Sequence, residues 1–323
     1  MISVAICTHN PRPQYLARVL DALKAQTLAR ERWELLLIDN ASDARLADSW
    51  NLSWHSGARH VREDSLGLTH ARLRAIDEAA GDILVFVDDD NVLDEDYLAE
   101  CKRIAQEMPF LGAWGGQQRG EFEIPPQEWM KPYLISIAIR EFSHTRWCNL
   151  PHVIDTVPYG AGLCVRTEIA RIWSEKTRGN HYRRSLGRIG NSLSACEDID
   201  LALTACDVGF GTGLLTSLCL THLIPKERLD PRYLAKVVEG SARSRVVLYR
   251  LRGIRQFLAS PDFSRKCASL IRRGIRQYRL WKLTPEARMI ERARIRGENF
   301  GLKFEKEIAK TDRNRGFGGK KLA

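Results

Sequence analysis

The sequence predicts an α/β fold with a central, mostly parallel sheet, followed by a basic and largely helical C-terminal region. Three observations support this prediction. Strand-like and helix-like segments alternate along about the first 110 residues. The strand-like segments are almost wholly apolar, as in strands buried on both faces of a parallel sheet. Lysine and arginine gather near the C-terminus, where acidic residues are few.

The first third of the chain supplies the clearest elements. The segment 2–7 is apolar and β-branched, which is typical of a buried strand. Leu16, Val19, Leu20 and Leu23 then recur at the spacing of one helical face. In chain order we expect a strand at 2–7, a helix at 11–26, strands at 33–39 and 59–64, a helix at 67–81, a strand at 82–90 and a helix at 94–108.

The segments after residue 110 are less regular. "GAWGG" predicts a strand that another backbone approaches closely, because its glycines carry no side chain. The remaining expectations are a helix at 127–139, a turn, short strand and helix within 158–173, and a helix at 196–209 with acidic residues in its first turn.

The composition describes a globular protein. Hydrophobic residues make up 44% of the 323 residues, and no apolar run approaches the roughly 18 residues of a membrane-spanning helix. The N-terminal segment lacks the pattern of a signal peptide. The eight cysteines form no C-x-x-C pairs, which favours reduced thiols in a cytosolic protein over a zinc site.

The net charge of +10 is unevenly distributed. Residues 228–323 contain 26 Lys and Arg against 9 Asp and Glu, a balance of +17, so residues 1–227 carry 24 against 31, a balance of −7. This contrast predicts a domain spanning 1–227, a basic helical region at 228–312 and a disordered, Gly- and Lys-rich tail at 313–323.

The basic region contains two amphipathic segments, 243–258 and 262–283, in which basic residues surround an apolar stripe. Such helices bind anionic membrane surfaces. Packing of the stripe against the rest of the molecule is the alternative, and the sequence leaves both open. We expect no nucleic acid, because no nucleic-acid motif accompanies the charge.

Polar side chains follow three of the predicted strands. Thr8 and Asn10 follow the first, Asp39 ends the second, and 88–90 is a run of three aspartates after the strand "ILVFV". The carboxyl ends of parallel strands meet at one edge, where α/β proteins bind ligands. Carboxylates there can hold Mg²⁺ or Mn²⁺ with a diphosphate. A solvated turn that caps the next helix is the alternative.

Seven segments occur in an order that resembles family 2 glycosyltransferases of the GT-A fold. The resemblance covers about residues 2–230 and implies a donor half at 1–110 and an acceptor half at 111–227. His9 stands where the family more often has Tyr, and Leu73 where it usually has Asn. The segments are "VAICTHN", "LLLIDNASD", "DSLGLTHAR", "FVDDDN", "YGAGLCV", "CEDIDLAL" and "LTHLIPKERL".

The resemblance implies a role for each matching residue on the donor side. Thr8 and Asn10 would line the nucleotide pocket, and Asp39 would accept a hydrogen bond from the base. Gly67 and Arg72 would lie against the nucleotide. The metal, Mn²⁺ or Mg²⁺, would be held by Asp90 with His222 near it or the diphosphate, while Asp89 would approach the ribose and Asp88 would assist or turn away.

The implied reaction is an inverting transfer of a sugar from a nucleotide-sugar donor, a UDP-sugar being favoured, to a hydroxyl of a saccharide or lipid-linked acceptor. Asp198 would be the general base, with Glu197 as the alternative. The setting would be cell-surface polysaccharide or glycolipid synthesis, in the cytoplasm or on its face of the membrane. A nucleotidyltransferase and a non-catalytic membrane-associated module are the alternatives, although "CTHNPRP" lacks the glycines of a phosphate-binding loop.

Overall fold

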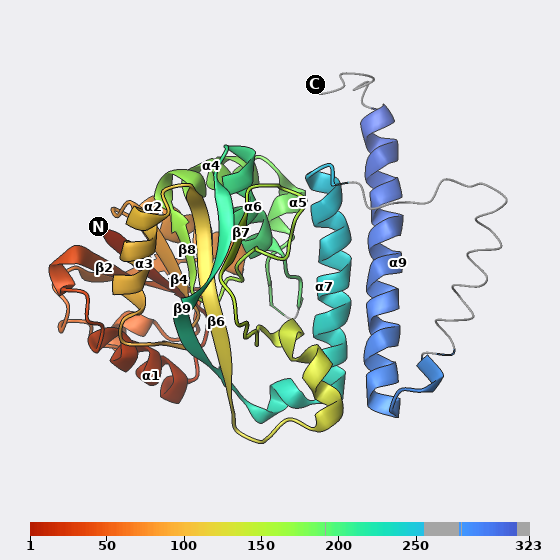
Figure 1. The fold of residues 1–323 in the computed structure, drawn as a ribbon, viewed down its shortest axis with the longest axis horizontal. Helices are drawn as coiled ribbons and strands as arrows, with labels where there is room; N and C mark the ends of the chain where they lie inside the picture. The colour runs from red at the N-terminus through yellow and green to blue at the C-terminus, as the bar shows by residue number, and fades with distance from the viewer. Residues whose placement is uncertain (191, 255–277, 279, 315–323) are drawn as a thin grey trace.

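The computed structural model describes residues 1–190, 192–254, 278 and 280–314 (Figure 1). Within these residues one curled sheet runs in the order β3-β2-β1-β4-β8-β6-β9-β5, and β7 pairs with β9. The strands are β1 (Ile2–Thr8), β2 (Trp33–Asn40), β3 (Ala58–Glu63), β4 (Ile83–Val87), β5 (Asn91–Leu93), β6 (Leu111–Phe122), β7 (Arg146–Cys148), β8 (Leu163–Arg166) and β9 (Gly211–Ile224).

The first four strands are parallel, as the sequence predicts. Their register places Thr8 opposite Asp39, so the carboxyl ends of β1 and β2 lie level at one edge. The strands that follow are mixed. β8 is antiparallel to β4 and to β6, whereas β6 and β9 run parallel to each other.

Helices cover both faces of the sheet (Figure 1). Leu16 of α1 and Tyr97 of α3 belong to the core on one face, whereas Ala71 of α2, Trp173 of α4 and Leu201 of α6 belong to the core on the other. The helices are α1 (Pro13–Lys24), α2 (Leu68–Glu78), α3 (Tyr97–Glu107), α4 (Thr167–Arg178), α5 (His181–Arg184), α6 (Glu197–Asp207), α7 (Pro231–Leu251) and α9 (Pro285–Asn314).

Two expected elements differ from the structure. The helix expected at 127–139 is a 3₁₀ helix, Glu128–Ile137, with Pro132 inside it. Proline removes a backbone donor and clashes with the preceding turn, so a regular α-helix is disfavoured. The strand expected at 82–90 ends at Val87, and the aspartates form a turn in which the amide of Asn91 donates to the carbonyl of Asp88.

The C-terminal helices α7 and α9 lie side by side and pack on the sheet domain (Figure 1). Val237 of α7, Ile290 of α9 and Met130 of the 3₁₀ helix share one apolar cluster. A Cβ on Gly297 would lie 2.2 Å from the carbonyl oxygen of Glu239, so glycine permits this close approach. No helix in the described residues is long and apolar enough to cross a membrane.

The structure describes most of the first amphipathic segment, 243–258, but little of the second, 262–283. In the first, Val246, Val247 and Leu248 of α7 are buried, which fits packing on the rest of the molecule. In the second, only 278 and 280–283 lie within the described residues, and Tyr278 and Trp281 are exposed there.

Candidate active site

A cavity of about 630 Å³ opens at the carboxyl ends of β1, β2 and β4 and extends to the start of α6 and one side of α7. The structure brings all but two of the sequence-predicted site residues to its walls. The residues it brings together are Thr8, Gly67, Arg72, Asp88, Asp89, Asp90, Glu197, Asp198 and His222.

Asn10 and Asp39 do not line the cavity. The side-chain amide of Asn10 donates to Asp43 at 3.0 Å, on the outside of the loop. The carboxylate of buried Asp39 accepts hydrogen bonds from the amides of Ser42 and Leu46 and from Arg62, 2.8 Å away. Burial would raise the pKa of Asp39, but these hydrogen bonds bring it below its ordinary value. Both residues hold the loop after β2 instead of facing the cavity.

His9, which the sequence marked only as a departure from the family pattern, also lines the cavity. It follows Thr8 at the end of β1, and its Nδ1 atom lies 2.9 Å from the carbonyl oxygen of Asn40. This contact keeps the ring beside the end of β2.

The three adjacent aspartates are accommodated in three different ways. Thr8 donates its hydroxyl to Asp89, and burial followed by the charge of Asp90 raises the pKa of Asp89 to about 7. Arg72 approaches Asp88 within 4.0 Å. Burial would raise the pKa of Asp90 too, but the charges of His222 and Arg228 hold it below its ordinary value. Partners and protonation therefore limit the repulsion within the triplet.

Asp90 and His222 share one partner, Arg228. Nη2 of Arg228 lies 2.8 Å from Oδ2 of Asp90, and its Nη1 lies 3.0 Å from Nε2 of His222. The same Nε2 atom is 3.4 Å from Oδ1 of Asp90. A buried carboxylate and an imidazole nitrogen therefore converge on one cationic group.

The carboxylate of Asp90 and the imidazole of His222 are groups that could hold a divalent cation if further ligands completed its coordination. Magnesium is held by one or two carboxylates with substrate phosphates, and imidazole also suits Mn²⁺. The described residues contain no cluster of three or more His, Cys, Asp or Glu side chains that could hold a metal ion. Asp90 and His222 would therefore need ligands from the substrate.

Arg72 connects the two halves of the sheet domain beneath the cavity. It belongs to α2, is almost fully buried, and donates from Nη1 to Oε1 of Glu197 at 2.9 Å. Burial raises the pKa of Glu197 to about 7 against the opposing charge of Arg72. A Cβ on Gly160 would lie 2.3 Å from Nη2 of Arg72, so glycine is required for this approach.

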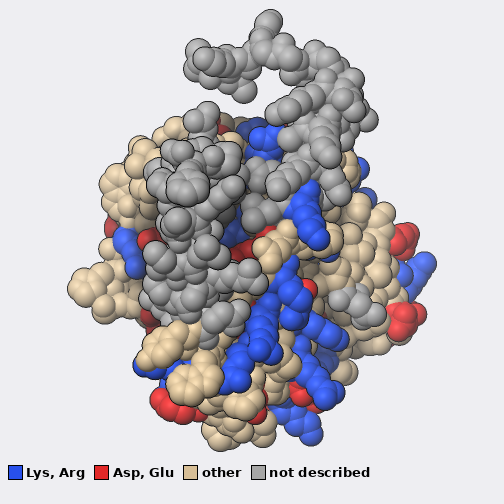
Figure 2. All heavy atoms as spheres, turned by 90° about the vertical axis from the view of Figure 1, so that its right-hand side faces the viewer, with Lys and Arg blue, Asp and Glu red and all other residues tan. Residues whose placement is uncertain are grey.

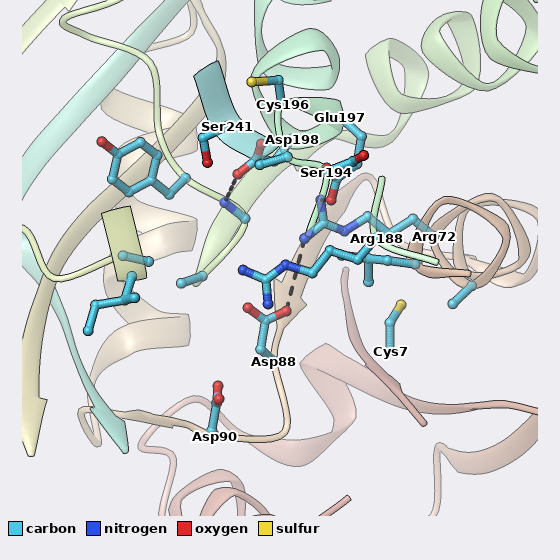
Figure 3. Close-up of a pocket in the computed structure, with 18 of the residues that line it drawn as sticks. Cys7, Arg72, Asp88, Asp90, Arg188, Ser194, Cys196, Glu197, Asp198 and Ser241 are labelled. Carbon is cyan, nitrogen blue, oxygen red and sulfur yellow. Dashed lines mark hydrogen bonds and ion pairs between the residues drawn. The ribbon is translucent and has the colours of Figure 1, made fainter. Parts of the chain in front are cut away.

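Asp198 is fixed at the start of α6, on the cavity wall opposite the aspartate triplet (Figure 3). Its Oδ2 atom accepts a hydrogen bond from the amide of Gly160 at 2.7 Å. Cys196, immediately before the helix, has a φ of 100°, which is unfavourable for a residue with a Cβ. Backbone strain of this kind is frequent at functional sites.

Several residues that line the cavity were not predicted from the sequence. Arg188 precedes α6, and Figure 3 shows its side chain pointing toward Asp88. Tyr233, Ser241 and Arg245 come from α7, which the charge boundary assigned to a separate region. Their spacing of eight and four residues places them on one helical face, a signal hidden by the basic composition of the segment.

Comparisons with known proteins identify the family of this chain. The model of "Glycosyl transferase family 2" matches residues 3–163. Over 91 residues, 27% of this chain and 15% of the relative, the chain is 33% identical to polypeptide N-acetylgalactosaminyltransferase 8 of Drosophila melanogaster.

The fold is similar to that of a solved structure, S. aureus TarS, with a TM-score of 0.52 and 14% sequence identity. That likeness covers 82% of this chain and 41% of TarS, so the chain spans less than half the length of either protein. On these grounds the chain belongs to glycosyl transferase family 2 and has the GT-A fold.

Proposed function

We propose that this chain transfers a sugar from a nucleotide-sugar donor to an acceptor hydroxyl, with inversion at the anomeric carbon. One observation carries the proposal. Asp90 and Asp198 lie on opposite walls of one cavity. Asp90 lies 3.4 Å from the imidazole of His222, and Asp198 is held by the backbone amide of Gly160. The volume of about 630 Å³ is within the range of small-molecule pockets, roughly 300–1,000 Å³.

Asp198 is the general base of the proposed reaction. Its carboxylate accepts hydrogen bonds from the amides of Gly160 and Ile199, and a carboxylate can accept about four. Acceptor sites therefore remain for the proton of an acceptor hydroxyl. Glu197 is less suited, because Arg72 already occupies its carboxylate. The acceptor oxygen bonds to the anomeric carbon as the bond to the diphosphate breaks, and a single displacement inverts the configuration.

The diphosphate would lie at the other end of the cavity. Asp90 and His222 would hold Mn²⁺ or Mg²⁺, which when bound neutralises the charge that develops on the leaving group. Arg188 and Arg228 add positive charge there, since both act on the aspartates of the triplet. Thr8 and Gly67 would contact the nucleotide of the donor, which we propose to be a UDP-sugar. The reaction would belong to cell-surface polysaccharide or glycolipid synthesis.

The proposal is tested with purified chain and a panel of UDP-, GDP- and dTDP-sugars. A bound nucleotide at about 100 times its dissociation constant stabilises the fold by roughly 2.7 kcal/mol, which thermal unfolding detects. Asp198→Asn should keep donor binding and lose about 10²–10⁴-fold in transfer. Asp48→Asn, an exposed change with the same charge difference, is the control.

Three results would overturn it. They are the failure of every nucleotide to bind, full transfer by Asp198→Asn, and retention of anomeric configuration in the product by NMR.

A further inference from the structure

Helix α7 forms one wall of the cavity, and its first turn and its middle lie near different groups. Tyr233 in the first turn is close to Arg228, the partner of Asp90, whereas the middle of the helix lies near the base. Tyr233, Ser241 and Arg245 lie along one side of this helix. Figure 3 shows Ser241 on the same side of the cavity as Asp198. In the proposed function the donor diphosphate lies by the triplet, so the part of the α7 wall from Ser241 to Arg245 is where an acceptor would bind.

Arg245 is an exposed arginine on this wall. In the part of the chain that the structure describes, its guanidinium has no ion-pair partner, although it lines the cavity. Its charge acts on Tyr159, Cys196 and Tyr249, all on the α6–α7 side. Arg188 and Arg228 differ, because their charges act on the aspartates. The donor end therefore has its own cations, and Arg245 is additional to them.

A second arginine, Arg140, lies against the ring of Tyr159, which lines the cavity. The guanidinium carbon of Arg140 lies 3.8 Å from the centre of the Tyr159 ring. Its Nη1 donates to the carbonyl of Val157, but its buried Nε and Nη2 atoms have no acceptor among the described residues. Burial lowers the pKa of Arg140. The charge of Asp198 acts on Arg140, but no carboxylate of the described residues forms an ion pair with it. An anion bound nearby would offset the cost of burying this cation.

Tyr159 lies between these charges and the base. Burial raises its pKa, the charges of Arg140 and Arg245 lower it, and the charge of Asp198 raises it. The tyrosine is thus within electrostatic reach of both arginines and of the catalytic carboxylate. A group that contacts Arg245 and the Tyr159 ring would bring the rest of its molecule to Asp198.

We propose that the acceptor carries an acidic group, a carboxylate or a phosphate, and that Arg245 binds this group beside Tyr159. The inference rests on the proposed function and adds the chemical class of the acceptor. A guanidinium forms charge-assisted, often bidentate hydrogen bonds with either anion, and these are about twice as strong as neutral ones. A hydroxyl of the same molecule can then donate a hydrogen bond to Asp198.

The basic surface outside the cavity agrees with an acidic acceptor. Figure 2 shows Lys and Arg side chains gathered on the face that α7 and α9 present. Such a surface raises the local concentration of anions and speeds their association. The exposed basic residues of these two helices include Arg232, Lys236, Arg243, Arg292, Arg296 and Lys303.

The test compares matched probes at one ionic strength by ligand-observed NMR. The probes are methyl glucuronoside, glucose 6-phosphate and neutral methyl glucoside, each titrated with UDP and diamagnetic Mg²⁺ present. At least one acid should bind about tenfold more tightly than the neutral sugar, and which one binds distinguishes carboxylate from phosphate. Arg245→Gln should abolish the preference, and Arg245→Lys should restore part of it.

Lys236→Gln is the matched control, because it removes the same charge from an exposed position of α7 outside the cavity. It should keep the preference. Equal binding of acid and neutral sugar, no detectable binding of either acid, or a preference that survives in Arg245→Gln overturns the inference. UDP binding, measured separately on the same protein, decides the proposed function. A chain that binds UDP without preferring the acids keeps the function and loses this inference.

Discussion

The Nη1 atom of Arg72 lies 2.9 Å from Oε1 of Glu197, and both side chains are almost fully buried. This ion pair joins α2, in the donor half, to α6, which carries the proposed base. Removing one partner of a buried pair leaves an uncompensated charge, at a cost of about 3–5 kcal/mol. Arg72→Met should therefore destabilise the protein by about that amount.

Glu197→Gln in the same background should recover part of the loss. Urea unfolding of the single and double variants measures the coupling. The exposed pair Arg103–Glu107 supplies a control cycle, expected at under about 1 kcal/mol. Additive losses at Arg72 and Glu197 would show that the pair does not join the two halves.

The second prediction concerns the pH dependence of stability. Burial raises the pKa of Glu197 to about 7 from its ordinary value of 4.5, so the folded chain binds more protons than the unfolded chain between these values. The contribution of Glu197 to stability should grow as pH falls from about 7 toward 4.5, by at most about 1.4 kcal/mol per pH unit, and level off below.

Unfolding of wild type and Glu197→Gln across this range isolates that slope, because the other carboxylates cancel in the difference. Glu175→Gln, an exposed change on α4, should track the wild type. A wild-type slope matched by Glu197→Gln would mean that Glu197 titrates like an exposed carboxyl.

Sequence patterns located the strands and helices better than the boundaries of the site. Apolar runs specified β1, β2 and β4, and their parallel register then brought Thr8 and the aspartates together. The same reasoning predicted that Asp39 would face the ligand site, but Asp39 does not line the cavity. Its position at the carboxyl end of β2 was right, but Arg62 of the neighbouring strand engages its side chain. Position along a strand does not reveal which partner a carboxylate will have.

The charge composition predicted a separate C-terminal region, but it did not reveal that part of this region contributes to the cavity. The charge change at 228 separates two chemistries, yet Arg228 pairs with Asp90 and α7 lines the cavity. Helix α7 is amphipathic with a basic outer side and an apolar inner side. Net charge averages over both sides, so it cannot reveal that Tyr233, Ser241 and Arg245 line the cavity.

The third prediction concerns an anionic membrane surface, which we propose as a partner of the segment 262–283. Each basic residue near such a surface contributes about 1 kcal/mol, and the attraction decays over about 8–10 Å. The protein should sediment with anionic vesicles at low salt and be released at high salt. Arg272 and Arg273→Glu should weaken sedimentation more than Arg32 and Arg45→Glu, two exposed residues of the donor half. If the wild-type protein does not sediment with anionic vesicles at low salt, the proposed membrane partner is wrong.

The last prediction concerns Arg228 and the cation. The guanidinium bridges Asp90 and His222, the two side chains proposed to hold Mn²⁺, so a cation must displace it. Arg228→Gln removes the competing charge and should bind Mn²⁺ at least about tenfold more tightly without nucleotide, a change of about 1.4 kcal/mol. The same variant should unfold at a lower temperature without Mn²⁺, because Asp90 loses its counter-ion, and recover when Mn²⁺ is added.

Electron paramagnetic resonance of free Mn²⁺ measures the affinity directly, independently of any sugar transfer. Arg232→Gln, an exposed charge change four residues along the chain, should bind Mn²⁺ like the wild type. Asp90→Asn should abolish Mn²⁺ binding in either background, since it removes the carboxylate that both cations need. If Arg228→Gln and the wild type bind Mn²⁺ equally, the guanidinium does not occupy the position of the cation, and Arg228 must act on the diphosphate or on the fold alone.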